Sequence, residues 1–359
     1  MPVSVVDHAG MEVEMSNRFT LLLAVLCACA ADGIVSTAAA QARTTDADWE
    51  VPRTRDGHPD LQGNWTNATL TPFTRRQDTP AVYTWDEVAE LEQTTGDCPA
   101  APGTVACGRA SFGGLSGQEY NEVYWDRGSR VAIVNGEPRA SLVTNPANGR
   151  IPLLTPEARE RRTQYGQVRR QFAQYDHPEM RPLAERCLVS FGSNAGPPML
   201  PNGGYNNNYT IVQTPDHVMI MSEMVHDARI IKIGDGPRLP PHIRPWMGDS
   251  WGHWEGDVLV VETTNIHPLQ RFRGNSSENL TVIERFSRVD EETILYQFTI
   301  DDPTTYTAPW GGEVPMKRFD DKLFEYACHE GNYSLASVLS GARYQERMEA
   351  QEANDAGRD

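Results

Sequence analysis

The sequence predicts a mainly β protein, folded as an antiparallel up-and-down barrel or a strongly curled sheet, with a few peripheral helices and long loops. Two observations lead to this prediction. Eight short runs rich in β-branched and aromatic residues follow one another across residues 209–328. Turn-forming residues separate most of these runs, and such short connections place consecutive strands side by side and antiparallel. Eight such strands are enough to close a barrel.

The expected strands cover residues 209–214, 217–224, 228–233, 257–265, 280–289, 293–300, 313–319 and 323–329. One connection differs from the others, because residues 237–254 form a long segment rich in proline and tryptophan. Such a segment is typical of a lid or rim loop.

The N-terminal half is predicted to be mostly loop, with helical insertions at 84–92 and 155–175. The first helix opens with a capping box, Thr84-Trp85-Asp86-Glu87, and the second with Thr155 followed by Pro156. Short strands are expected at 122–126, 130–134 and 139–143. Asn135-Gly136 predicts a hairpin turn between the last two of these strands.

Residues 1–42 have the pattern of a signal peptide, with an apolar stretch from Phe19 to Ala31 that is too short to span a bilayer. Leu26-Cys27-Ala28-Cys29 also fits a lipoprotein box, so a lipid anchor on Cys29 is the alternative. We therefore expect a periplasmic or secreted protein with a single barrel-type domain over 43–340 and no membrane span. The charged segment 341–359 is predicted to be a flexible tail.

The formal net charge of −17 argues against nucleic acid and phosphorylated substrates, because a like-charged field repels both. Four cysteines follow the leader, and an even number in an oxidising compartment favours disulfides. Cys98 and Cys107 bracket a short proline- and glycine-rich loop, which predicts a local bridge. Cys187 then pairs with Cys328, unless one of these is a catalytic thiol.

Four ionisable residues in the C-terminal half are the catalytic candidates: His226, Glu262, Glu284 and His329. By alternation, His226 shares a strand face with Ile220 and Met224, where it would act as a base or be a core histidine satisfied by Asp227. The same alternation puts each glutamate on an apolar face, where burial would make it a usable acid. If the other face points inward, Thr263, Asn265 and Arg285 line the interior instead.

The substrate-binding candidates are Arg229, Asp249, Trp251, Trp254 and Asn265. Arg229 would clamp a carboxylate or carbonyl oxygen, or pair with Glu223 or Asp227 in a structural role. The two tryptophans would stack on a ring or a sugar, or would only pack over the barrel mouth.

No cofactor is expected, because the chain has neither a P-loop nor a Gly-x-Gly-x-x-Gly, and no Gly-x-Ser-x-Gly elbow. A divalent metal held by His226, His253 and His329 with a glutamate is the alternative. It lacks a spaced ligand motif such as His-Glu-x-x-His.

Asp60-Leu61-Gln62-Gly63-Asn64-Trp65 carries a Gly-x-Trp that resembles the first-strand motif of lipocalins and related calycin barrels. The chain also resembles a family of secreted bacterial proteins, through the blocks PDLQGNWTN, HDARIIKI, GDSWGHWEGDVLVVETTN, SENLTVIERFSRVD, DDPTTYTAPW and ACHEGNYS. These resemblances imply a lipocalin-like barrel and one secreted module. They bring no catalytic residues.

The sequence therefore predicts a barrel enzyme that carries out acid–base chemistry, such as elimination, hydration or isomerisation, on a small uncharged or aromatic, terpenoid-like molecule. A hydrolase or lyase acting on glycans is one alternative, because paired carboxylates with tryptophans suit that class. A non-catalytic binding barrel is the other. The sequence does not indicate an oligomeric state.

Overall fold

The computed structural model describes residues 49–96, 128–190, 196–201, 204, 206–270 and 277–357, all within one compact unit, Arg43–Asp359. The predicted signal peptide, the anchor on Cys29, the strand at 122–126 and the bridge between Cys98 and Cys107 lie outside the described residues. None of the helices within the described residues is long and apolar enough to cross a membrane.

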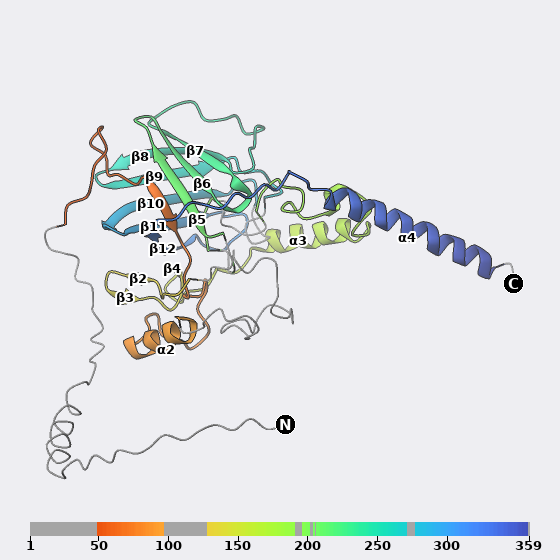
Figure 1. Ribbon diagram of the computed structural model, residues 1–359, viewed down its shortest axis with the longest axis horizontal. Helices are drawn as coiled ribbons and strands as arrows, with labels where there is room; N and C mark the ends of the chain where they lie inside the picture. Colours follow the sequence, from red (N-terminus) through yellow and green to blue (C-terminus); the bar gives the residue numbers. More distant parts are fainter. Residues whose placement is uncertain are drawn as a thin grey trace, which may run out of the picture. The chain divides into compact units, whose positions relative to one another are not determined.

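Nine strands close into a barrel, which confirms the predicted mainly β fold (Figure 1). In order around the barrel they are β1 (Gly63–Thr66), β5 (Asn208–Gln213), β6 (His217–Ser222), β7 (Ala228–Ile233), β8 (Asp249–Glu255), β9 (Val258–Thr264), β10 (Thr281–Asp290), β11 (Thr293–Asp301) and β12 (Trp310–Arg318). The end of β12 pairs with β1 and closes the circle, while its start pairs with a tenth strand, β4 (Val143–Asn145).

One pair of strands departs from the predicted antiparallel order, because β7 and β8 run parallel. Residues 234–248 make the crossover that parallel neighbours require. The predicted lid loop at 237–254 is therefore part crossover and part strand, since β8 occupies its last six residues, 249–254. The sequence of β8, DSWGHWE, has no β-branched residue, and its strand conformation comes from pairing with β9 on one side and β7 on the other.

The barrel interior is filled by alternate residues of each strand. On β10, Val282, Glu284, Phe286 and Arg288 are buried, and the residues between them are partly exposed. Trp65 of the Gly-x-Trp motif is fully buried, with the Arg288 guanidinium 5.1 Å from its ring centroid. Each large apolar side chain buried in this way contributes about 1.5–3 kcal/mol of transfer free energy.

The two ends of the barrel differ in the length of their connections. One end, here called the turn end, has tight turns such as 256–257 and 291–292. The opposite end, here called the loop end, carries the connections at 223–227, 265–280 and 302–309. Long connections on a rigid scaffold are where binding and catalytic groups concentrate.

Outside the barrel lie the short hairpin of β2 (Ile133–Val134) and β3 (Glu137–Pro138), helices α2 (Trp85–Gly96), α3 (Pro156–Arg169) and α4 (Ser334–Ala356), and the 3-10 turns η2 (Pro178–Met180) and η3 (Met224–His226). The predicted caps are present, since Glu87 accepts from the Thr84 amide at 2.7 Å and Thr155 accepts from the Ala158 amide at 3.1 Å. Helix α3 ends six residues before the predicted boundary at Tyr175.

The C-terminal region differs from the prediction in two places. Residues 323–329 form no strand and end in a bend at Cys328 and His329, so the predicted last strand is absent there. The segment predicted to be a flexible tail instead continues helix α4 as far as Ala356. Glutamate, glutamine, arginine and alanine dominate this segment, and all of them favour helix.

Candidate active site

A buried ion pair crosses the barrel interior between β7 and β10. Arg229 donates to both carboxylate oxygens of Glu284, with Nη1 to Oε2 at 2.7 Å and Nη2 to Oε1 at 3.0 Å. Tyr296 donates its hydroxyl proton to the same Oε1 at 2.8 Å and accepts from the Met199 amide at 2.9 Å. Burial, together with the Glu284 carboxylate, raises the pKa of Tyr296 well above its ordinary value. Both predicted residues are thus inside the barrel and bound to each other.

Glu262 lies on the opposite face of the barrel wall, so the expectation that it faces inward is wrong. Leu259, Val261 and Thr263 are the inward residues of β9, and Glu262 is exposed. Its carboxylate pairs with Arg238 at 3.0 Å. Both faces of VLVVETT are apolar along most of their length, and alternation alone cannot tell which of them is the interior.

Three of the predicted binding residues hold the crossover segment against the barrel. The buried Asp249 carboxylate accepts from the Leu239 amide at 2.8 Å and from Trp251 Nε1 at 3.3 Å. Asn265 donates to the Leu239 carbonyl at 2.7 Å. Lys232 Nζ lies 4.8 Å from the centroid of the Trp251 ring, so the ring already has a cation as its partner.

Trp254 is placed elsewhere, towards the turn end of β8. Its ring stacks on the imidazole of His58, with centroids 4.8 Å apart and planes 5° from parallel. Trp254 is also partly buried against the hydrophobic core. Trp251 and Trp254 therefore do not form one aromatic surface with the catalytic candidates.

The charges of His226 and His329 both act on the same carboxylate, that of Asp227, although the two histidines are about a hundred residues apart in sequence. Asp227 follows His226 at the corner between β6 and β7, while His329 comes from segment 323–329, here called the strap. Asp227 is half-buried, and its Oδ2 has no hydrogen-bond partner among the described residues. Burial raises the pKa of this carboxyl group, and the positive charges of His329 and His226 partly oppose the rise.

The backbone of this corner is strained. Val225 and His226 have φ angles of 64° and 59°, in the left-handed region that β-branched residues rarely adopt. Each such residue costs on the order of 1–3 kcal/mol, and strain of this kind concentrates at functional sites. The strand alternation predicted through His226 fails here, because β6 ends at Ser222 and the turned backbone leaves the His226 side chain exposed.

A fully buried carboxylate, Glu223, fixes the strained corner in place. It accepts from Asn206 Nδ2 at 2.7 Å, from Asn208 Nδ2 at 3.2 Å and from the Phe324 amide at 2.9 Å. The last of these bonds joins the corner to the strap. The sequence predicts Glu223 only as a partner for Arg229, and no local pattern indicates its contact with residue 324.

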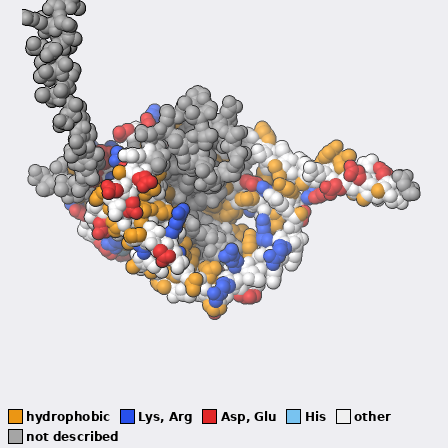
Figure 2. Space-filling view, turned by 90° about the horizontal axis from the view of Figure 1, so that it is seen from below, with side chains coloured by type: hydrophobic (Ala, Val, Ile, Leu, Met, Phe, Trp, Pro, Cys, Tyr) orange, Lys and Arg blue, Asp and Glu red, His pale blue; other side chains and the backbone are white. Residues whose placement is uncertain are grey.

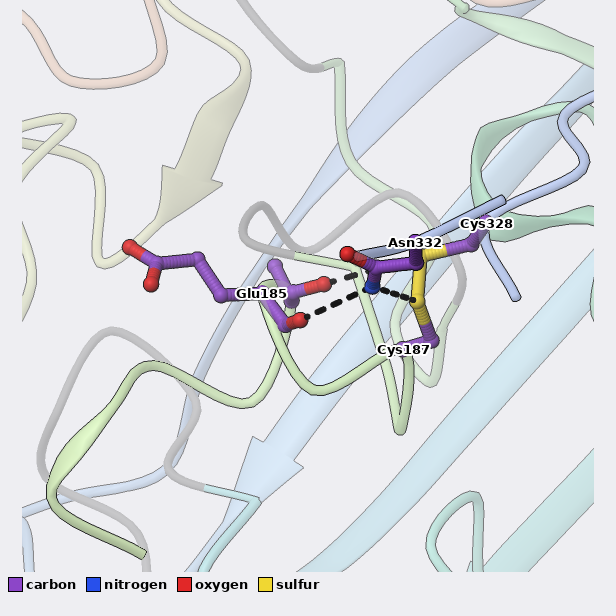
Figure 3. The surroundings of a disulfide bond; sticks show 5 residues. Glu185, Cys187, Cys328 and Asn332 are labelled. Atoms are coloured by element: carbon purple, nitrogen blue, oxygen red, sulfur yellow. Dashed lines mark hydrogen bonds between the residues drawn. A yellow bond between two sulfur atoms is a disulfide. The ribbon is translucent and has the colours of Figure 1, made fainter. Parts of the chain in front are cut away.

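The far end of the strap is held by the disulfide between Cys187 and Cys328, which confirms the predicted bridge (Figure 3). Asn332 lies across the bridge and donates to Cys187 Sγ at 3.3 Å and to the Glu185 carbonyl at 3.4 Å. The strap is thus fixed at Phe324 and Cys328, and its position next to Asp227 depends on both attachments.

A pocket of about 490 Å³ opens beside the strap. Its lining includes Cys328 and Glu330, on either side of His329, together with Tyr326, Leu335 and Val338. Arg181 and Glu185 line it as well, so charged side chains of both signs stand beside the apolar ones.

Within the described residues, no group of three or more histidine, cysteine, aspartate or glutamate side chains is arranged to hold a metal ion. The chain matches no protein-family model, no curated protein and no solved structure. The site is therefore interpreted from its own chemistry.

Replacing Asp227 with asparagine is expected to stabilise the protein at neutral pH, by less than about 1 kcal/mol, because solvent screens a half-exposed group. A carboxyl group whose pKa is raised on folding favours the folded state below its unfolded pKa. This contribution is lost as the pH rises through the folded pKa. The gain in the free energy of unfolding of Asp227→Asn should therefore grow as the pH rises from acid to neutral, measured by urea denaturation.

Asp216 provides a control of opposite sign. Hydrogen bonds from His217 and Thr214 lower the pKa of its carboxyl group. Its stabilising contribution is present above the unfolded pKa and is lost as the pH falls through the folded pKa. Asp216→Asn should therefore be the less stable protein at neutral pH and match the parent in acid. The same trend in both variants would contradict our interpretation of Asp227.

Proposed function

We propose that this protein is a periplasmic or secreted enzyme that carries out proton transfers on a small uncharged molecule at the corner between β6 and β7. The observation behind the proposal is the half-buried Asp227 carboxylate, which has an unpartnered oxygen and lies near two histidines on a strained backbone. The disulfide between Cys187 and Cys328 is compatible with an oxidising compartment.

The roles follow from the properties of the three side chains. Histidine exchanges protons near neutral pH, so exposed His226 is the base that removes a proton from the substrate. His329, held from the other side by the strap, returns a proton as the acid. The Asp227 carboxylate stabilises whichever histidine becomes positively charged. Elimination, hydration and isomerisation need only such groups.

The substrate is best described as uncharged and partly apolar. The net charge of −17 disfavours anions. In the pocket beside the strap, an apolar or aromatic body such as a terpenoid would contact Tyr326, Leu335 and Val338, and its polar groups would face Arg181 and Glu185. A glycan hydrolase has less support, because Glu262 and Glu284 lie on opposite faces of the barrel wall and do not form a carboxylate pair across one substrate.

A non-catalytic binding barrel is the second candidate. The buried ion pair between Arg229 and Glu284 favours this candidate, because it leaves Glu284 occupied. An enzyme acting inside the barrel would need a free acid there, whereas a binding protein would not. The two candidates differ at the corner, where only an enzyme requires the strained Asp227 site.

A substrate screen across phenolics, terpenoids and oligosaccharides, with and without a chelator, tests the proposal. Once turnover is found, His226→Ala and His329→Ala should each lower kcat by about 10²–10⁴-fold, the usual contribution of a positioned acid or base. His217→Ala is the matched control, because this exposed histidine lies at the turn end of β6 and should leave kcat unchanged. Full activity in both corner variants, or binding without turnover, would favour the binding barrel. Loss of activity with the chelator alone would point to a metal.

A further inference from the structure

Helix α4 continues past its last hydrogen bond to the rest of the described chain. Arg343 attaches it, donating to the backbone oxygens of Tyr175 at 3.2 Å and Asp176 at 3.4 Å. Within the described chain, the hydrogen bonds, ion pairs and ring contacts of residues 344–357 stay inside the helix. No residue of α4 is buried. Isolated helical segments shorter than about 12–15 residues are marginal in water, so this segment would gain stability from a partner.

Apolar side chains are exposed on both helices of this region. Helix α3 and the turn after it carry Tyr165, Val168, Phe172 and Tyr175, spaced by three, four and three residues and between 36% and 54% exposed. On α4, Tyr344 and Met348 lie one turn apart and are 58% and 40% exposed. Exposed apolar groups gathered in one region indicate an interaction surface.

The two surfaces carry opposite charge. Residues 156–172 contain five arginines and two glutamates, a basic exception in an acidic protein. Residues 344–357 contain three glutamates and one aspartate against a single arginine. Figure 2 shows Lys and Arg side chains gathered near the base of the projecting helix, and Asp and Glu side chains along the helix itself.

We infer that two copies of this chain form a symmetric dimer in which the distal half of α4 of each copy, residues 344–357, lies along α3 of the other. A two-fold axis brings α3 of each copy against the distal half of α4 of the other, so the same contact forms twice. The arginines of α3 would face the acidic residues of α4, with Tyr344 and Met348 against Val168 and Phe172. This assembly is independent of the proposed catalysis.

Sedimentation velocity on the purified, disulfide-bonded protein tests the inference, at concentrations on the order of 1–100 µM, where modest interfaces associate. One variant reverses the basic surface with Arg159→Glu, Arg162→Glu and Arg170→Glu. A second reverses the acidic surface with Glu349→Arg, Glu352→Arg and Asp355→Arg. Each variant alone should dimerise at least about tenfold more weakly, because like charges then face each other. A one-to-one mixture of the two should restore a heterodimer.

The matched control reverses three exposed acidic residues at the turn end, with Asp235→Lys, Glu291→Lys and Asp321→Lys, and should dimerise like the parent. Far-UV circular dichroism checks that each variant is folded. If a reversal variant does not fold, deletion of residues 344–359 replaces it and should give a monomer. A parent protein that is monomeric throughout, a dimer that survives both reversals, or a mixture that stays monomeric would each overturn the inference.

Discussion

Replacing Arg229 with alanine is expected to lower the free energy of unfolding by about 3–5 kcal/mol, because Glu284 is then left charged in the interior without a cation. The two side chains are almost completely buried and share two hydrogen bonds. The Tyr296 hydroxyl also donates to Glu284, but one neutral donor cannot replace a guanidinium. Urea denaturation with tryptophan fluorescence gives the measurement.

A double variant separates the loss of the pair from the loss of packing. Arg229→Met with Glu284→Gln removes both charges, keeps similar volume, and leaves an amide oxygen to accept from Tyr296. Most of the stability should return, because replacing both members of a buried ion pair is often close to neutral. A double variant as unstable as Arg229→Ala would show that the side chains act by shape and not by charge.

Removing the disulfide with Cys187→Ser and Cys328→Ser is expected to cost up to about 4–5 kcal/mol. The chain-entropy model assigns this amount to loops of roughly a hundred residues or more. The bridge joins residues separated by 141 positions. It is also one of the two attachments of the strap, the other being the bond from the Phe324 amide to Glu223. We therefore expect His329 to lose its position near Asp227 in this variant.

NMR of the imidazole rings tests the second effect without a substrate. In the parent protein, Asp227→Asn should shift the ring resonances of both His226 and His329. In the background without the disulfide, the same substitution should shift only His226, because that residue is adjacent in sequence. His217 serves as the reference ring in both backgrounds. A His329 ring that still responds to Asp227→Asn after loss of the bridge would show that the contact with Glu223 holds the strap by itself.

Local patterns were sufficient for much of the fold. The alternation along β10 and β11, the capping residues Thr84 and Thr155, and the Asn135-Gly136 turn all describe interactions between residues close in sequence. Both residues of that turn have the positive φ that the prediction requires. The bridge between Cys187 and Cys328 was predicted by pairing the remaining cysteines, and the structure confirms it.

The candidate site was predictable only in part. His226 and His329 were predicted as catalytic candidates together with Glu262 and Glu284, but the expected common interior of the four residues is not present. Strand β6 ends before His226, Glu262 faces outward, and Glu284 is paired with Arg229. Each difference depends on a partner distant in sequence, such as the Phe324 amide on Glu223.

The sequence by itself determined most strands of the barrel, the starts of helices α2 and α3, and where charge interrupts apolar runs, because propensity, alternation and capping act over a few residues. Only the tertiary structure decided which face of β9 is the interior, that β7 and β8 run parallel, and that Asp227 lies near two histidines. The physical reason is that burial and pairing free energies depend on which surfaces meet. The residues next to a strand with two apolar faces, or next to a histidine at a turn, do not indicate which distant residue will be its partner.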